Sequence, residues 1–170
     1  MILLRNVALL TLVVGCLIAC MTVRPGVARA DKADMNARER AVVRSIDAQR
    51  ASHGLRGLRG NAGLAQAADY HSWEMLDANY FAHESRDGGS FDARVRRFAP
   101  HRALGETLAM VGGGCRGGLA SRVVSMWMNS PGHRAILLSS SFRLVGIGAR
   151  AGSLGSGRAC VVTADFGSRR

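Results

Sequence analysis

The sequence predicts an α+β domain in which helices pack against a small β-sheet. Two segments with apolar residues at helical spacing come first in the predicted domain, and shorter helical segments then alternate with a strand. The chain ends in two strand-like segments joined by a turn rich in Gly and Ser. This order favours a layered α+β arrangement over a parallel sheet with regular helical crossovers.

Two long helices are predicted in the first half of the domain. The first spans residues 35–52, with Asp34 as its N-cap and Gly54 as its end. Apolar residues gather on one face of this helix, and arginines and acids occupy the other. The second helix spans residues 62–79, and Asn61 precedes it as an N-cap.

Shorter elements follow. Ser90 caps a basic helix at residues 91–98, which ends before Pro100, and a strand is predicted at residues 104–111. A glycine-rich loop around Cys115 separates this strand from the next helix. The remaining predicted elements are two helices at residues 119–128 and 130–138, and two strands at residues 143–151 and 158–166.

Residues 1–30 have the pattern of a signal peptide. Few charges precede an apolar run at residues 7–21, which is short for a membrane span. The sequence Ala28-Arg29-Ala30 fits a signal peptidase site, so we expect one domain at residues 31–170. The alternative is a lipoprotein signal that ends before Cys20, which would anchor the chain to a membrane. Both interpretations predict an extracytoplasmic protein.

The composition narrows the classes of partner. The leader holds three arginines and no acid, so the net charge of +11 for the whole chain becomes +8 for the domain. A basic exported domain is expected to meet anionic envelope components or lipid. The arginines are scattered and aromatic residues are few, so nucleic acid is not an expected partner. We expect a monomer.

Cys115 and Cys160 are the two cysteines that follow the predicted cleavage site. An even pair in an oxidising compartment usually forms a disulfide bond. We therefore predict a bridge between them.

Five short motifs in order resemble the CAP superfamily, also called the SCP/PR-1-like domain, in its short bacterial secreted form. The resemblance covers residues 36–167. The motifs are Phe-Ala-His-Glu-Ser at 81–85, Gly-Glu-Thr-Leu-Ala at 105–109, Trp-Met-Asn-Ser-Pro-Gly-His-Arg at 127–134, Val-Gly-Ile-Gly at 145–148 and Val-Val-Thr-Ala-Asp-Phe at 161–166.

The resemblance implies a three-layer α-β-α sandwich with a small antiparallel sheet. It also implies a pocket lined by two histidines and two acids, and His83, Glu106 and His133 match three of these four. Thr107 replaces the Asn that follows the Glu in the family. Ser130 stands where the second acid belongs, and no motif assigns that role to Glu84, Asp87 or Asp165.

Two imidazoles and one carboxylate form the ligand set of many catalytic zinc sites. His83, His133 and Glu106 are therefore candidate ligands of a divalent cation such as Zn²⁺, in a pocket that also includes Ser130. Glu106 could instead be a buried structural acid. A helical histidine such as His71 is expected to pack, and His53 and His101 are expected at the surface.

Three functions compete. The first is a non-enzymatic binding module of the cell envelope, whose pocket holds a cation or a small or lipidic ligand. The second is a structural or signalling domain with a vestigial pocket, which the replacement of the acid by Ser130 favours. The third is a metal-dependent hydrolase, such as a peptidase. The sequence contains neither a His-Glu-x-x-His motif nor a serine in a nucleophile motif, so no residue is assigned as catalytic and enzymatic activity is left open.

Overall fold

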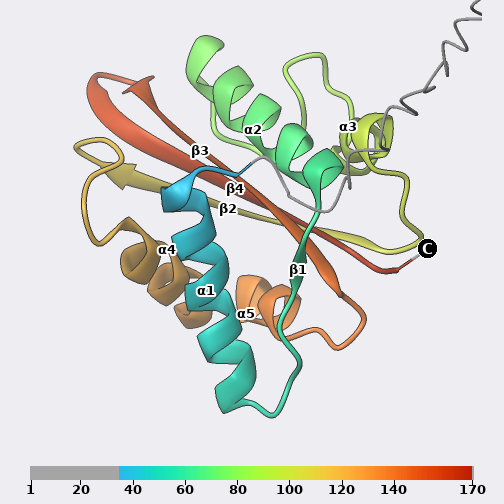
Figure 1. The fold of residues 1–170 in the computed structure, drawn as a ribbon. Helices are drawn as coiled ribbons and strands as arrows, with labels where there is room; N and C mark the ends of the chain where they lie inside the picture. The colour runs from blue at the N-terminus through green and yellow to red at the C-terminus, as the bar shows by residue number, and fades with distance from the viewer. Residues whose placement is uncertain (1–34, 170) are drawn as a thin grey trace, which may run out of the picture.

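The computed structural model describes residues 35–169, so the predicted signal peptide and the Cys20 alternative lie outside it. The helices are α1 (Ala37–Ser52), α2 (Ala62–Asp77), α3 (Phe91–Phe98), α4 (Leu119–Asn129) and α5 (Pro131–Leu137). The strands are β1 (Arg59–Gly60), β2 (Leu104–Gly112), β3 (Leu144–Leu154) and β4 (Gly157–Gly167). Figure 1 shows one sheet between two helical layers, which confirms the predicted α-β-α sandwich.

The sheet has the strand order β1-β3-β4-β2. β3 and β4 form an antiparallel hairpin, and β2 pairs antiparallel with β4 over its whole length. Arg59 and Gly60, which lie between the two long helices and outside every predicted element, form a two-residue strand parallel to β3. The sheet is therefore antiparallel except at this short edge.

The two faces of the sheet bury separate cores. Helices α1, α4 and α5 cover one face, where Ile46, Trp127 and Phe166 belong to the largest buried cluster. Helices α2 and α3 cover the opposite face, where Leu64 and Val95 pack together. Because β4 lies between β3 and β2, it is buried on both faces, and its sequence is almost continuously apolar.

The helix starts agree with the predicted N-caps except at α1. Asn61 and Ser90 accept hydrogen bonds from the first turns of α2 and α3, as predicted. At α1 the cap is Asn36 rather than Asp34, because Asn36 and Glu39 form a capping box. The Asn36 side chain accepts from the Glu39 amide, and the Glu39 carboxylate accepts from the Asn36 amide at 2.7 Å.

The final hairpin is tighter than predicted. The sequence suggests a turn at residues 152–157, but β3 continues to Leu154 and β4 begins at Gly157. Gly155 adopts a φ of +59°, which a glycine accepts without strain. Two residues therefore suffice for the turn.

Cys115 and Cys160 form the predicted disulfide bond. Their Cα atoms lie 4.8 Å apart, and the bond closes a loop with a sequence separation of 45 residues. It ties the glycine-rich loop after β2 to the start of β4, opposite Val111 in the sheet.

Removal of this disulfide bond is expected to destabilise the domain strongly. A loop of this length restricts the unfolded chain by about 4 kcal/mol in the chain-entropy model. We expect the Cys115→Ala/Cys160→Ala variant to lose most of that free energy of unfolding in urea titrations. Adding reductant should destabilise the native protein and leave the double variant unchanged. An equal response of both proteins would contradict the prediction.

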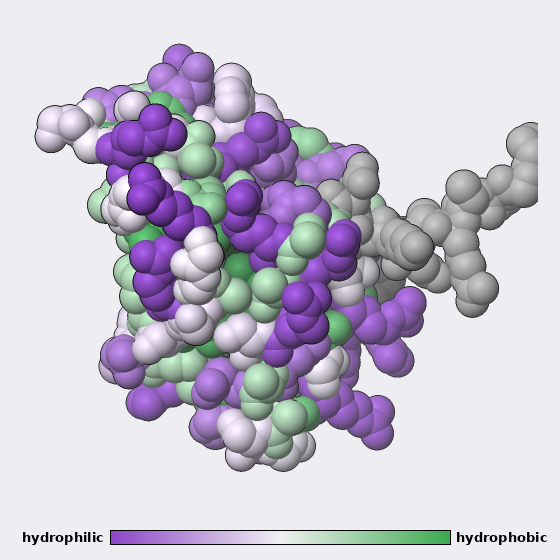
Figure 2. Space-filling model, turned by 60° about the vertical axis from the view of Figure 1, so that its left-hand side comes forward, coloured by the Kyte–Doolittle hydropathy of each residue, from purple (hydrophilic) through white to green (hydrophobic). Residues whose placement is uncertain are grey.

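The described surface is mixed in character. On the face drawn in Figure 2, hydrophilic side chains are interspersed with hydrophobic ones, without one broad apolar area. No helix within residues 35–169 is both long enough and apolar enough to cross a membrane.

Candidate functional site

His83 and Glu106, which are distant in sequence, lie in direct contact. His83 is in the loop between α2 and α3, and its side chain is 47% exposed. Glu106 is in β2, and its side chain is 1% exposed. The His83 Nδ1 atom lies 2.8 Å from the Glu106 Oε1 atom. The site thus has a buried carboxylate at its base and an accessible imidazole above it.

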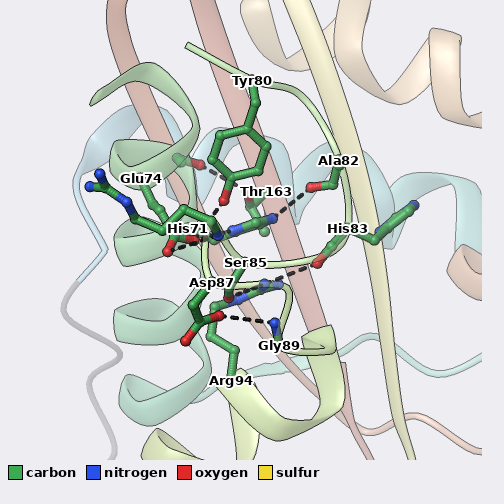
Figure 3. Close-up of polar contacts among 12 residues, drawn as sticks. His71, Glu74, Tyr80, Ala82, His83, Ser85, Asp87, Gly89, Arg94 and Thr163 are labelled. Carbon is green, nitrogen blue, oxygen red and sulfur yellow. Dashed lines mark hydrogen bonds and ion pairs between the residues drawn. The ribbon is translucent and has the colours of Figure 1, made fainter. Parts of the chain in front are cut away.

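Arg94 holds this pair in place. Its side chain is buried in α3 and forms an ion pair with the other oxygen of Glu106, Oε2. It also donates to the His83 carbonyl at 3.0 Å and to the Ser85 hydroxyl at 3.2 Å. Figure 3 shows the guanidinium reaching the loop, with the His83 ring turned away from it. One arginine therefore neutralises the buried acid and fixes the loop that carries His83.

No sequence motif assigns a role to Arg94, although the sequence contains a signal for its burial. Phe91 and Val95 lie four residues apart, at helical spacing, and both belong to the apolar cluster on the inner side of α3. Arg94 falls on that same face. An arginine on an apolar face requires a buried partner, because an unpaired guanidinium is too costly to desolvate.

Asp165 lies directly across the sheet from Glu106. The carbonyl of Leu108, two residues after Glu106 in β2, accepts a hydrogen bond from the Trp127 indole. The backbone N–H and C=O groups of Leu108, and those of Glu106, therefore point away from β4. Glu106 and Asp165 therefore form a non-hydrogen-bonded pair, in which opposite side chains approach most closely. A second acid is present beside Glu106, but it comes from the last strand rather than from position 130.

Asp165 is fully buried, and neither of its oxygens has a hydrogen-bond partner when both acids are ionised. Burial raises the pKa of Asp165 well above its ordinary value, and the negative charge of Glu106 raises it further. Below this raised pKa, Asp165 holds a proton that it can donate to Glu106. It is a neutral support for the Glu106 carboxylate and has no access to solvent.

His133 lies in α5 and is partly buried. Desolvation lowers its pKa, and the charge of His83 lowers it further. The hydrogen bond to Glu106 raises the pKa of His83. Ser130 lies between α4 and α5 and makes no side-chain cap. The structure thus brings His83 and Glu106 into contact, while Ser130 and His133 lie at the start of α5.

A second buried network supports the same loop. His71 Nε2 lies 2.9 Å from the Ala82 carbonyl, and Nδ1 lies 3.1 Å from Glu74 Oε2. Tyr80 donates to the same Glu74 oxygen at 2.7 Å, as Figure 3 shows. His71 is a packed residue, as predicted, and it anchors the residue next to His83.

The other two histidines differ from each other. His53 is exposed, as predicted. His101 was expected at the surface but is only 5% exposed. Its ring packs against Gly167, at a place where a side chain on residue 167 would collide with it.

The residues do not fit a divalent metal as they are arranged. Both oxygens of Glu106 already have partners, and one of these is the guanidinium of Arg94, whose charge repels a cation. Within the part of the chain that the structure describes, no three His, Cys, Asp or Glu side chains are grouped to hold a metal ion. The ion pair of Arg94 with Glu106 therefore opposes the binding of a cation to this carboxylate.

Replacing Asp165 by Asn is expected to stabilise the domain near neutral pH. The folded state retains the Asp165 proton above the ordinary pKa of 3.8, whereas the unfolded chain releases it. Wild-type stability should therefore fall by up to about 1.4 kcal/mol per pH unit above that value, until the folded-state pKa is reached. The Asp165→Asn variant has no such proton to release, so its stability should not fall in this way as the pH rises.

Urea titrations from pH 4 to pH 8 measure this effect. The exposed Asp77→Asn variant is the control. A gap between Asp165→Asn and wild type that does not widen with pH would contradict the assignment of a buried proton.

Comparisons with known proteins agree with the fold and assign the chain to a family. The family model described as "CAP: Cysteine-rich secretory protein family" matches residues 43–166. The chain is 35% identical over 115 residues to the Bacillus subtilis (strain 168) protein YkwD, covering 67% of this chain and 43% of YkwD. It is 32% identical over 113 residues to the membrane protein YlbC of the same organism, covering 65% of this chain and 31% of YlbC. The chain thus spans less than half the length of either relative.

Solved structures show the same architecture. An extracellular SCP-domain protein from Bacillus anthracis superposes with a TM-score of 0.64 at 26% identity, covering 78% of this chain and 40% of that protein. An outer surface protein from Borrelia burgdorferi gives a TM-score of 0.63 at 19% identity, covering 80% of this chain and 96% of that protein. With the family model matching most of the chain, this protein belongs to the CAP family of cysteine-rich secretory proteins.

Proposed function

We propose that this protein is a non-enzymatic binding module outside the cytoplasm, and that the site around His83 binds a small ligand with an anionic group, such as a lipid headgroup. The disulfide bond supports an oxidising compartment. The extracellular and surface locations named for the two superposed structures support the same placement.

The observation that carries the proposal is the ion pair beneath an exposed imidazole. Arg94 balances the charge of Glu106, and Asp165 is neutral, so a protonated His83 leaves the site with a net positive charge. The outer face of the His83 ring is accessible, and His133 adds a second imidazole near it. An anionic group would gain charge-assisted hydrogen bonds there.

Binding can be measured with inorganic phosphate and with short-chain phosphatidylglycerol as probes, by calorimetry and by NMR of the histidine rings. We expect His83→Gln to weaken binding by about tenfold, the loss of one charge-assisted contact. The exposed His53→Gln variant is the matched control and should bind like wild type. Binding should strengthen as the pH falls, because His83 gains its proton. Equal affinities for the two variants would leave only a structural role for the site.

Metal removal is expected to leave the fold intact. The disulfide bond and two hydrophobic layers stabilise the described domain without a metal. Thermal melts with EDTA should match those without it, and excess Zn²⁺ should raise the melting temperature only slightly. Even a bound cation at a hundredfold excess over its Kd adds only about 2.7 kcal/mol. Unfolding on chelation would show that a structural metal is present.

A further inference from the structure

The two edges of the sheet differ in what covers them. At the β3 edge, the Ala149 amide donates to Glu39 and the Ile147 amide donates to the Met35 sulfur, so the start of α1 covers this edge. At the β2 edge, the Leu108 carbonyl accepts from Trp127 at 2.9 Å. Among the described residues no strand pairs with this outer side of β2.

The orientation of Leu108 determines which other backbone groups face outward. Alternate residues of an edge strand point the same way, so the N–H and C=O groups of Met110 also point away from β4. A row of outward backbone groups on an edge strand is a template for another extended chain.

A shallow groove of about 650 Å³ lies between this edge and α4. Met110 and Met126 line it and are 45% and 47% exposed, the highest values among the large apolar side chains that the structure describes. The polar side chains in the groove are those of Ser121, Arg122 and Ser125. In Figure 1, β2 is the outermost long strand of the sheet, on the side where α4 lies.

The charged residues that line the groove or lie next to it in the sheet are arginines. From Thr107 to Ala164 the sequence contains six arginines and no Asp or Glu. Arg122 lies in the groove, and Arg158 precedes the β4 residue that pairs with the end of β2. Two copies of this chain joined through β2 would bring these arginines together, so the charge favours an acidic partner over a second copy.

We propose that the β2 edge and the α4 groove bind an extended acidic segment of a partner protein, which adds a strand to the sheet. The backbone of the partner pairs with Met110, its apolar side chains pack between Met110 and Met126, and a carboxylate contacts Arg122. This mode of recognition combines main-chain hydrogen bonds with pockets for alternate side chains. The surface is separate from the His83 site and does not depend on its proposed ligand.

The probe is a short synthetic peptide that alternates valine and glutamate, with a valine–lysine peptide of the same length as its counterpart. We expect the acidic peptide to bind and to slow hydrogen exchange of the Met110 amide. Met110→Pro removes an outward donor without breaking the pairing with β4, and it should weaken binding by about tenfold. Arg122→Glu should weaken binding of the acidic peptide and improve binding of the basic one.

Circular dichroism establishes that each variant is folded, and Arg116→Glu, outside the groove, is the charge control. Three results would overturn the proposal. The first is equal binding of both peptides. The second is sedimentation of the protein alone as a dimer that Met110→Pro dissociates, which would assign the edge to a second copy. The third is binding to phosphatidylglycerol vesicles through Met126 with no effect of Met110→Pro, which would assign the groove to a lipid surface.

Discussion

The Gly148→Ala variant is expected not to fold, with a loss of more than about 4 kcal/mol in the free energy of unfolding. A Cβ atom at this position would overlap the backbone of Ala68 and Asp69 in α2. Gly146 meets the backbone of Leu64 and Ala65 in the same way. Because both neighbours are main-chain atoms in a packed helix, no side-chain rotation can relieve the overlap.

Soluble yield and urea unfolding of Gly148→Ala, compared with Gly112→Ala, test this expectation. Gly112 ends a strand of the same sheet, but no atom lies within 4 Å of the place where its Cβ would stand. Its replacement by Ala should change stability by less than about 1 kcal/mol, with a gain from the lower entropy of the unfolded chain. A folded Gly148→Ala protein of normal stability would show that α2 does not lie as close to β3 as described.

For the glycine motif at residues 145–148, the sequence predicts the strand but not the packing of a helix against it. The strand and hairpin pattern of the sequence predicted a strand at residues 143–151, and the structure confirms β3 there. The reason for the glycines is a tertiary one, since they let the axis of α2 approach the sheet. Helix and strand patterns follow from local periodicity, whereas the distance between two layers depends on residues far apart in the chain.

At the candidate site, too, the sequence predicts some residues but not the contacts between distant segments. The motifs identified His83 and Glu106, and the structure joins them by a hydrogen bond. Arg94 was treated as part of a basic helix, and Asp165 was given no assigned role. Only the register of β2 with β4 places Asp165 opposite Glu106, and a sequence without known register cannot show this.

Surface accessibility was also hard to predict. His101 stands beside a proline and was expected at the surface, but the end of β4 packs against it. Similarly, β1 is too short for any alternation of polar and apolar residues, and it forms only because β3 offers an edge. These differences all arise where a nonlocal contact overrides a local pattern.

Replacing Arg94 by Met is expected to cost about 3–5 kcal/mol, because it leaves the charge of Glu106 buried without its cation. Little of this loss should come from a cavity, because methionine fills most of the space of the arginine stem. The loop that carries His83 would also lose the two hydrogen bonds that Arg94 donates to His83 and Ser85. Urea unfolding measures the first effect, and hydrogen exchange of the loop amides measures the second.

A double-mutant cycle separates the charge from the packing. In Arg94→Met/Glu106→Gln the buried charge is removed together with its partner, so the double variant should be more stable than Arg94→Met alone by at least about 2 kcal/mol. The control is Arg86→Met, which breaks an exposed ion pair with Asp77 and should cost less than about 1 kcal/mol. If Arg94→Met costs no more than Arg86→Met, or if Glu106→Gln restores nothing, then Arg94 does not neutralise the acid beneath His83. The positive charge on which the proposed anion site depends would then have to come from elsewhere.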